Sequence, residues 1–349
     1  MRSGAVAHLG SLWAWDPTEV TSDLRALDSG GRWGVVLPYA GAPVLVRFSQ
    51  WSITPPEADI GPWTGVPKDR WASSLSQEQY IAGVRRIHEH IASGEVYQVN
   101  LCRVLEADIE RSDDIVALHR ALAVGNPAPY SSMMSVPDVD LHVACASPEL
   151  FLRREGNFLS SGPIKGTAAS SGLLLDKDLA ENVMIVDLVR NDLSRVARTG
   201  SVRVPDLLRI EEHPGLVHLV SDVQCGLAEG TQWSDIVAAT FPPGSVTGAP
   251  KSSALRIIDE CETASRDVYC GAVGWIDADR QAAELAVAIR TFWIRDHVLR
   301  FGTGAGITWG SDPHGEWQET ELKARNLCDI ASRSVPTHHG IPMLRSVTG

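Results

Sequence analysis

The spacing of apolar residues divides the chain into segments with the period of a helix and segments with the period of a strand. The clearest helix follows Ser76, which can form a capping box with Gln79, and it ends at Gly94. One face of this helix carries a stripe of apolar side chains, namely Ile81, Val84, Ile87 and Ile91. Further helices are predicted at 178–193, from 251 to about 261, and from about 315 onward.

Strands are indicated between these helices by alternating and β-branched runs. They are predicted at 33–37, 43–48, 96–105, 149–154, 157–159, 216–223, 269–276, 283–293 and 298–302. A Gly- and Pro-rich loop at 241–251 leads into a helix, an arrangement suited to holding an anion. The tryptophans of the first 72 residues are predicted to serve packing rather than binding; they are Trp13, Trp15, Trp33, Trp51, Trp63 and Trp71.

The segment 160–167 places Lys165 between Pro-Ile and Gly-Thr, where the backbone turns sharply. The preceding hairpin is expected to bring Glu149 and Lys165 to the same end of a sheet. A lysine amine acts as a nucleophile only when it is neutral, which requires burial or a neighbouring cation to lower its pKa from about 10.4. A surface lysine in a loop can have the same local sequence, so the rest of the chain must decide between the two interpretations.

Two of the predicted helices carry acidic residues three positions apart, so that both carboxylates leave the same helix face. The pairs are Asp178 with Glu181 and Glu316 with Glu319, and Lys323 follows on the face of the second pair. Carboxylates near a helix N-terminus also compensate the helix dipole without any metal. Between two helices, however, they would suit Mg²⁺, which takes oxygen ligands and keeps several waters. Arg290 could then fork onto a substrate carboxylate.

Composition narrows the classes of function. The 349 residues carry a formal net charge of −12, so no net-charge argument favours nucleic acid or an anionic membrane as a partner. The six cysteines show neither a Cys-x-x-Cys pair nor a zinc spacing. The first ten residues lack the apolar run of a signal peptide, and no stretch is long and apolar enough to span a bilayer. A cytoplasmic protein is the expectation.

Several motifs together resemble those of the chorismate-utilising enzymes, which include component I of anthranilate synthase and of aminodeoxychorismate synthase, isochorismate synthase and salicylate synthase. The resemblance runs from about Ser76 to Leu327, with the motifs in family order. The motifs are Ser147-Pro148-Glu149, Pro163-Ile164-Lys165-Gly166-Thr167, the run from Ala180 to Leu193, Thr247-Gly248-Ala249-Pro250-Lys251, Gly304-Ala305-Gly306-Ile307 and Glu316-Trp317-Gln318-Glu319-Thr320.

Two positions discriminate within the family. Isochorismate and salicylate synthases resemble one another in having a lysine, the base that activates water, where this chain has Gln98. Anthranilate synthases typically have alanine where this chain has Lys165, whereas a lysine there marks the aminodeoxychorismate synthases. The resemblance therefore implies component I of aminodeoxychorismate synthase, an enzyme of para-aminobenzoate and folate biosynthesis.

The resemblance also implies a mechanism. Lys165 would attack C2 of chorismate as the C4 hydroxyl leaves, Glu149 would act as general acid and base, and ammonia would then enter at C4 to give 4-amino-4-deoxychorismate. Mg²⁺ would be held directly by Glu181 and Glu319 and through water by Asp178 and Glu316. The substrate-site positions implied by the family are Arg290, Tyr269, Gly304, Ala305, Gly306, Thr167, His218, Thr247, Lys323 and Gln98.

The family also implies an α+β fold, a large and mostly antiparallel β-sheet assembly flanked by helices. We divide the chain into a shortened β-rich N-terminal region at 1–72, a chorismate-binding catalytic domain at 73–333 and a flexible tail at 334–349. The shortened N-terminal region predicts no tryptophan feedback site. After Thr167 the x-Pro-Arg that is usual in the family is replaced by Ala168-Ala169-Ser170-Ser171, so the arginine is missing.

No cysteine lies in a glutaminase-type nucleophile motif, so ammonia is expected from solution or from a separate glutamine amidotransferase subunit. Three other functions stay open at this stage. They are component I of anthranilate synthase, a catalytically silent partner of an amidotransferase, and a metal-dependent hydrolase. The silent partner is disfavoured by the retention of four residues, namely Glu149, Lys165, Glu181 and Glu319. The hydrolase is disfavoured because nothing beyond the metal itself would activate a water.

Overall fold

The computed structural model describes residues 4–56, 61–109, 115–168, 176–213 and 216–334. The tail predicted at 334–349 lies, apart from Ser334, outside the described residues. The helices are α1 (Gln77–Ala92), α2 (Ile115–Gly125), α3 (Asp176–Ser194), α4 (Trp233–Thr240), α5 (Lys251–Cys261) and α6 (Pro313–Ala331), and the short 3₁₀ helix η6 covers Gly244–Val246.

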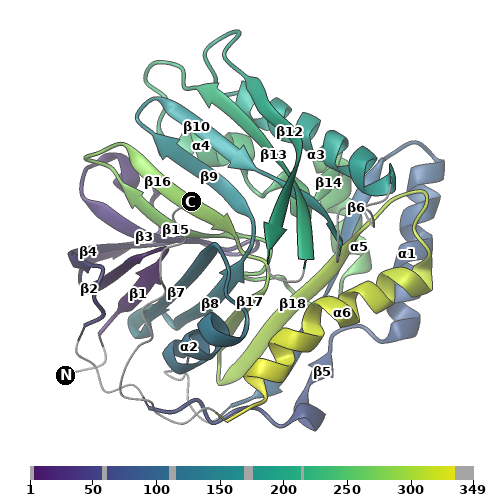
Figure 1. Ribbon diagram of the computed structural model, residues 1–349, viewed down its shortest axis with the longest axis horizontal. Helices are drawn as coiled ribbons and strands as arrows, with labels where there is room; N and C mark the ends of the chain where they lie inside the picture. Colours follow the sequence, from purple (N-terminus) through teal and green to yellow (C-terminus); the bar gives the residue numbers. More distant parts are fainter. Residues whose placement is uncertain (1–3, 57–60, 110–114, 169–175, 214–215, 335–349) are drawn as a thin grey trace.

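The strands connect into a single hydrogen-bonded sheet that curls on itself (Figure 1). In chain order they are β1 (Val6–Leu9), β2 (Leu12–Thr21), β3 (Arg32–Leu37), β4 (Val44–Ser52), β5 (Ala72–Ser73), β6 (Gln98–Asp108), β7 (Tyr130–Val136), β8 (Leu141–Ser147), β9 (Leu150–Glu155), β10 (Phe158–Gly162), β11 (Ile164–Ala168), β12 (Arg203–His213), β13 (Leu216–Gly226), β14 (Gly248–Ala249), β15 (Ala272–Asp277), β16 (Ala282–Val287), β17 (Thr291–Arg295) and β18 (Val298–Ile307).

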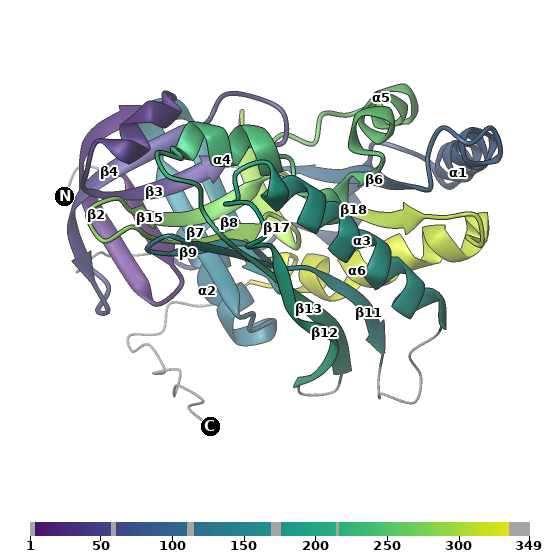
Figure 2. The same ribbon diagram turned by 90° about the horizontal axis from the view of Figure 1, so that it is seen from above.

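Every strand pair formed by the described residues is antiparallel, so the predicted α+β class with a large antiparallel sheet is confirmed. Helices pack on the sheet through their apolar faces, α3 on β13, α2 on β7 and β8, and α6 on β18. Figure 2 shows α1 and α5 at one end of the molecule and β2, β3 and β4 at the other. The helix α3 also contacts β11, and α6 contacts β18, the strand that pairs with β6.

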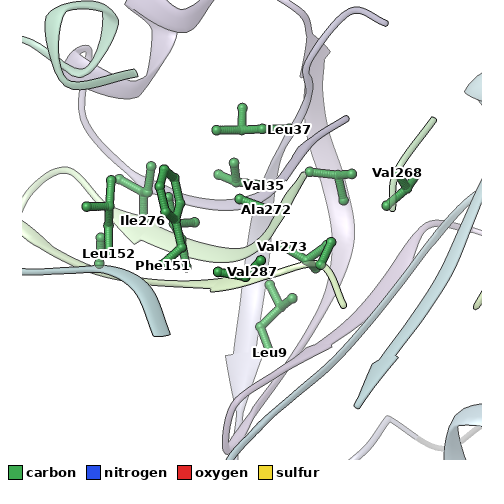
Figure 3. Close-up of a cluster of buried hydrophobic side chains, with 14 of the residues drawn as sticks. Leu9, Val35, Leu37, Phe151, Leu152, Val268, Ala272, Val273, Ile276 and Val287 are labelled. Carbon is green, nitrogen blue, oxygen red and sulfur yellow. The ribbon is translucent and has the colours of Figure 1, made fainter. Parts of the chain in front are cut away.

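The largest hydrophobic core of the described residues joins side chains of the sheet with side chains of α3 and α4. Figure 3 shows part of it, with Val35 from β3, Phe151 from β9 and Val273 from β15. The N-terminal strands are part of this core, because β3 pairs with β15 along its whole length and β1 pairs with β7. The first 52 residues thus build the sheet rather than a separate unit, and the boundary that we placed at residue 72 stays a prediction.

Most of the predicted elements are present. The capping box of Ser76 and Gln79 begins α1, and the hairpin predicted before Lys165 is formed by β9 and β10. The strand predicted at 283–293 is wrong as a single element, because the chain breaks at Arg290, whose φ is 51°. This break allows β16 to pair with β9 and β15 while β17 pairs with β8 and β18. The last strand is longer than predicted and continues through the glycines to Ile307.

Among the helices of the described residues, none combines the length and the apolar character that crossing a lipid bilayer requires.

The packing role predicted for the tryptophans can be tested at Trp63. Its side chain is buried against α6, and its Nε1 donates to the carbonyl of Ala331 over 2.9 Å. We expect Trp63→Ala to lower the free energy of unfolding by about 3–5 kcal/mol in urea, because it leaves a large cavity. Trp309→Ala, at a tryptophan whose exposed fraction is 68%, is the control and should change stability by less than about 1 kcal/mol. Equal losses at the two positions would contradict the packing role.

Candidate active site

Lys165 lies at the centre of a buried polar cluster. It belongs to β11, whose pairing with β13 becomes irregular directly after this residue. The Nζ of Lys165 lies 3.0 Å from Oε1 of Glu181 on α3. It also donates to the carbonyl oxygen of Ser245, in η6, over 3.2 Å. The side chain of Lys165 is only 14% exposed and is paired, so Lys165 is not a freely exposed surface lysine in a loop.

The same oxygen of Glu181 accepts a second hydrogen bond, from Nε2 of Gln98 on β6, over 2.7 Å. Space for this arrangement depends on Gly306 of β18. A Cβ at Gly306 would lie 2.2 Å from Gln98 Nε2 and 2.7 Å from Glu181 Oε1. A glycine is thus required here by close approach, and Gln98, Glu181, Lys165 and the backbone of Gly306 form one surface. Gln98 Oε1 is buried without a hydrogen-bond partner among the described residues.

Glu149 follows β8 and is 5% exposed. Burial raises the pKa of its carboxyl from 4.5 to about 7. Three smaller effects lower this pKa but do not cancel burial: a hydrogen bond from Ser245, the charge of Lys165 and the backbone N–H of Ile164. The β9–β10 hairpin pairs Leu150 with Gly162, so Glu149 and Lys165 lie near the same end of the sheet, as predicted. A carboxyl with a pKa near neutrality is suited to give and take a proton.

The amine of Lys165 is held in its charged form. Burial by itself lowers the pKa of this lysine, but the negative charges of Glu181 and Glu149, with a smaller effect of Glu319, outweigh burial and raise it. A lysine must be neutral to attack carbon. The amine therefore becomes a nucleophile only when a change at the site removes its proton or draws charge away from these carboxylates.

One carboxylate of α6, that of Glu319, acts on the charge of Lys165. Glu316 is 4% exposed, and Glu319 pairs with Lys323 over 2.7 Å. Lys323 also donates to the carbonyl of Gly304 over 3.0 Å, which fixes α6 against β18. The side chain of Asp178 lies outside the described residues.

The donors in this region fit a hard divalent cation in their chemistry, because they are carboxylate oxygens and include no soft ligand. Glu181 on α3 and Glu319 on α6 both act on the charge of Lys165, so both lie near its amine. In the part of the chain that the structure describes, however, no three His, Cys, Asp or Glu side chains are gathered in a position to hold a metal ion. The predicted ligand set thus fits by donor type, and its assembly stays a prediction.

Two of the predicted substrate residues are Tyr269 and Arg290. Tyr269 is buried, and its ring lies against the backbone of β18 so closely that a Cβ at Gly302 would be 2.1 Å from the ring. Arg290 is half-buried, its pKa is lowered by burial, and it forms no ion pair with any described carboxylate. A guanidinium in this state is available for an anion.

The other predicted positions serve the framework in this structure. Thr247 donates its hydroxyl to the carbonyls of Pro243 and Gly244 and so shapes the η6 loop. Ala305 is buried in the core formed with α1 and α5. Thr167 and His218 face one another in the register of β11 and β13, and their side chains lie outside the described residues.

Sequence reasoning missed Ser245, which contacts both Lys165 and Glu149. The Gly- and Pro-rich loop was identified, but a single serine within it carries no signal of its own. The anion-holding role predicted for that loop stays a prediction. Lys251, the first residue of α5, pairs with Oδ2 of Asp192 over 2.7 Å.

With this geometry in place, comparison with known proteins defines the class. A family profile described as chorismate binding enzyme matches residues 62–329, and the chain therefore belongs to that family. Anthranilate synthase component 1 of Neisseria meningitidis serogroup B (strain ATCC BAA-335 / MC58) is 40% identical over 271 residues, which cover 74% of this chain and 54% of that protein. Aminodeoxychorismate synthase component 1 of Bacillus subtilis (strain 168) is 35% identical over 270 residues, 73% of this chain and 56% of that protein.

The chain thus spans about half the length of the curated relatives that it matches, 54% and 56% in these two cases. Two solved structures share the fold. Anthranilate synthase component I from Streptococcus pneumoniae TIGR4 superposes with a TM-score of 0.74 at 23% identity, covering 93% of this chain and 90% of that one. The menaquinone-specific isochorismate synthase from Escherichia coli superposes with a TM-score of 0.74 at 19% identity, covering 94% of this chain and 88% of that one.

The close approach at Gly306 predicts a loss of function on adding one methyl group. In Gly306→Ala the new Cβ must displace the amide of Gln98 and the carboxylate of Glu181. We expect chorismate-dependent activity to fall about a hundredfold, since misplacement of catalytic groups by about 1 Å can cost that much. Gly310→Ala is the matched control, because a Cβ there meets no atom within 4 Å. Wild-type activity of Gly306→Ala would contradict the proposed surface.

Burial of Glu149 predicts a pH-dependent effect on stability. Because its folded pKa is raised to about 7, this group favours folding below pH 4.5, and that contribution is lost as the pH rises to about 7. Glutamine cannot ionise, so Glu149→Gln should gain on the order of 3 kcal/mol over the wild type between pH 4.5 and pH 8 in urea unfolding.

The exposed Glu78 supplies the control for this measurement, since Glu78→Gln should show no such gain. A stability difference between Glu149→Gln and the wild type that does not change with pH would show that Glu149 is not held in its protonated form by burial.

Proposed function

We propose that this chain is the chorismate-aminating component of an aminodeoxychorismate synthase, which converts chorismate and ammonia into 4-amino-4-deoxychorismate and water. The observation that carries the proposal is the setting of the Lys165 amine. It pairs with the carboxylate of Glu181, donates to the carbonyl of Ser245, and its charge acts on the carboxyl of Glu149. A buried lysine next to a carboxyl with a pKa near 7 is a pair suited to covalent and proton-transfer chemistry.

In this proposal the lysine proton passes to Glu149 before the chemistry begins. Such a transfer turns an ammonium and a carboxylate into a neutral pair, which burial favours. The amine of Lys165 then forms a bond to C2 of chorismate, both ring double bonds shift by one position, and the bond from C4 to its hydroxyl breaks. The proton on Glu149 goes to the departing hydroxyl, which leaves as water.

The second half of the reaction reverses the use of these groups. Ammonia forms a bond at C4, both double bonds shift back, and the bond from C2 to the nitrogen of Lys165 breaks, so that the lysine leaves as a neutral amine. Glu149, now a carboxylate, takes the proton that the incoming nitrogen loses. Arg290, Tyr269 and the backbone of β18 from Gly304 to Gly306 are proposed to bind the substrate and hold its ring against Lys165.

Glu181 and Glu319 are proposed to hold Mg²⁺ directly, with Asp178 and Glu316 at positions linked through water. Mg²⁺, when bound, would supply charge to polarise a carboxylate of the substrate and would offset the charge of Glu181. In the structure, Gln98 and Lys165 orient the Glu181 carboxylate from two sides, which keeps its oxygen at the surface near Gly306.

Gln98 supports amination over hydration. Its amide donates to Glu181 and has no group able to take a proton from water. Isochorismate and salicylate synthases resemble one another in a lysine base at this position. Nucleophilic water would lack its base here, whereas ammonia needs none to attack.

A second candidate is formation of anthranilate. The relative from Neisseria meningitidis, and another from Aquifex aeolicus (strain VF5) at 40% identity over 270 residues, both bear the name anthranilate synthase component 1. Lys165 favours the first candidate because anthranilate synthases typically have alanine there. We further propose that a separate glutamine amidotransferase supplies ammonia in the cell, which the name component 1 of these relatives supports.

Identification of the product tests the proposal. The protein is incubated with chorismate, Mg²⁺ and ammonium at mildly alkaline pH, and the products are identified by mass and chromatography. A separate aminodeoxychorismate lyase should then convert the product to para-aminobenzoate. Anthranilate in place of para-aminobenzoate would establish the second candidate. No product without a partner protein would favour the silent-partner function that the sequence left open.

Removal of the Lys165 amine should abolish amination at C4. We expect Lys165→Ala to lower kcat by at least about a hundredfold, because the first bond to C2 cannot form. Glu149→Gln should lower kcat by about 10²–10⁴ through loss of proton transfer. Lys68→Ala, at an exposed lysine paired with Asp329, is the control and should keep wild-type kcat. An unchanged kcat in Lys165→Ala would rule out the covalent role.

A further inference from the structure

Arg266 is the most completely buried charged side chain of the described residues that the proposed reaction leaves without a role, with an exposed fraction of 2%. It lies in the turn before β15, outside the motifs that identified the family. Its partner is Glu262, directly after α5, and both side chains are buried. The guanidinium donates to the two carboxylate oxygens from Nε at 2.9 Å and from Nη2 at 2.6 Å.

The remaining donors of Arg266 reach two other parts of the chain. Nη1 donates to the carbonyl of Val246 in η6 over 2.8 Å, and Nη2 donates to the carbonyl of Asn100 in β6 over 2.7 Å. Glu262 in turn accepts the backbone N–H of Cys102 over 2.8 Å. The ion pair therefore joins α5, β6 and η6. The guanidinium of Arg266 also stacks on the ring of Tyr39, in the N-terminal region, with 4.6 Å between the guanidinium carbon and the ring centre.

The two carbonyls lie next to the groups that carry the proposed chemistry. Val246 follows Ser245. The carbonyl of Ser245 accepts a hydrogen bond from Lys165, and its side chain forms one with Glu149. Asn100 lies two residues after Gln98 on the same strand, and its N–H donates to the carbonyl of Thr247 over 2.8 Å. The guanidinium thus fixes η6 against β6 at the place where Lys165, Glu149 and Gln98 converge.

We propose that Arg266 and Glu262 form a positioning pair that holds the η6 loop in register with β6, so that Ser245 keeps Lys165 and Glu149 aligned for reaction. Neither residue touches the reacting atoms. A guanidinium suits this role because its planar fork can bind a carboxylate and two carbonyls at once, which an ammonium cannot do. The inference rests on the proposed function for its assay.

The test uses a double variant that leaves no buried charge, Arg266→Met with Glu262→Gln. Removal of only one partner would strand a buried ion, whereas neutral replacements of similar volume are often tolerated. The amide oxygen introduced by Glu262→Gln can still accept the N–H of Cys102, so the variant removes chiefly the donors to Val246 and Asn100. The matched control is Arg32→Met with Asp277→Asn, which removes an ion pair of 2.8 Å between β3 and β15, away from Lys165.

We expect kcat of the double variant to fall ten- to a hundredfold, measured well below the melting temperature, with KM for chorismate changed less than threefold. The control should keep kcat within twofold at a comparable loss of Tm. Hydrogen exchange should also speed up at residues 243–248 in the double variant and not in the control. Wild-type kcat in the folded double variant, or an equal loss of kcat in the control, would overturn the positioning role.

If the double variant does not fold, Arg266→Lys carries the test. It keeps the charge but cannot reach both carbonyls, so kcat should fall five- to tenfold at unchanged KM, and wild-type kcat would overturn the inference. The two proposals fail separately. Absence of aminated product from the wild type counts against the proposed function, whereas normal hydrogen exchange at 243–248 in the variants counts against the positioning pair alone.

Discussion

One carboxylate oxygen organises the site. Oε1 of Glu181 accepts from the amine of Lys165 and from the amide of Gln98, and it lies where only a glycine at 306 leaves space. Three elements distant in sequence, α3, β11 and β6, meet at this oxygen, and β18 forms the surface beneath it. Burial of a lysine costs free energy unless it is paired, so this contact is a condition for placing Lys165 inside the protein.

The same contact limits the chemistry. Pairing with carboxylates raises the pKa of Lys165, which opposes its use as a nucleophile, while burial raises the pKa of Glu149 to about 7, which prepares it to accept a proton. Burial of the carboxyl thus works toward proton transfer, and the pairing of the amine works against it. Ser245, held by both groups, keeps them next to one another. The resting protein thus holds a charged amine beside a carboxyl, and transfer of one proton between them would give the reactive pair.

Sequence reasoning succeeded where the signal was local. The capping box at Ser76, the hairpin before Lys165 and the long helix carrying Glu181 each depend on a few neighbouring residues, and all three are present. The break at Arg290 was missed because the run around it is apolar and β-branched, and only tertiary pairing with two different partners interrupts it. Ser245 and Arg266 were missed because their importance comes from contacts across the fold.

Intact-protein mass spectrometry during turnover tests the central claim, that Lys165 is the nucleophile. The protein is held with chorismate and Mg²⁺ in the absence of ammonium, and the peptide that carries Lys165 is then sequenced. The account predicts a species heavier by the mass of chorismate less one water, located on Lys165, which disappears when ammonium is added. Aminated product formed by the same preparation with no such species, or with the adduct on another residue, would contradict it.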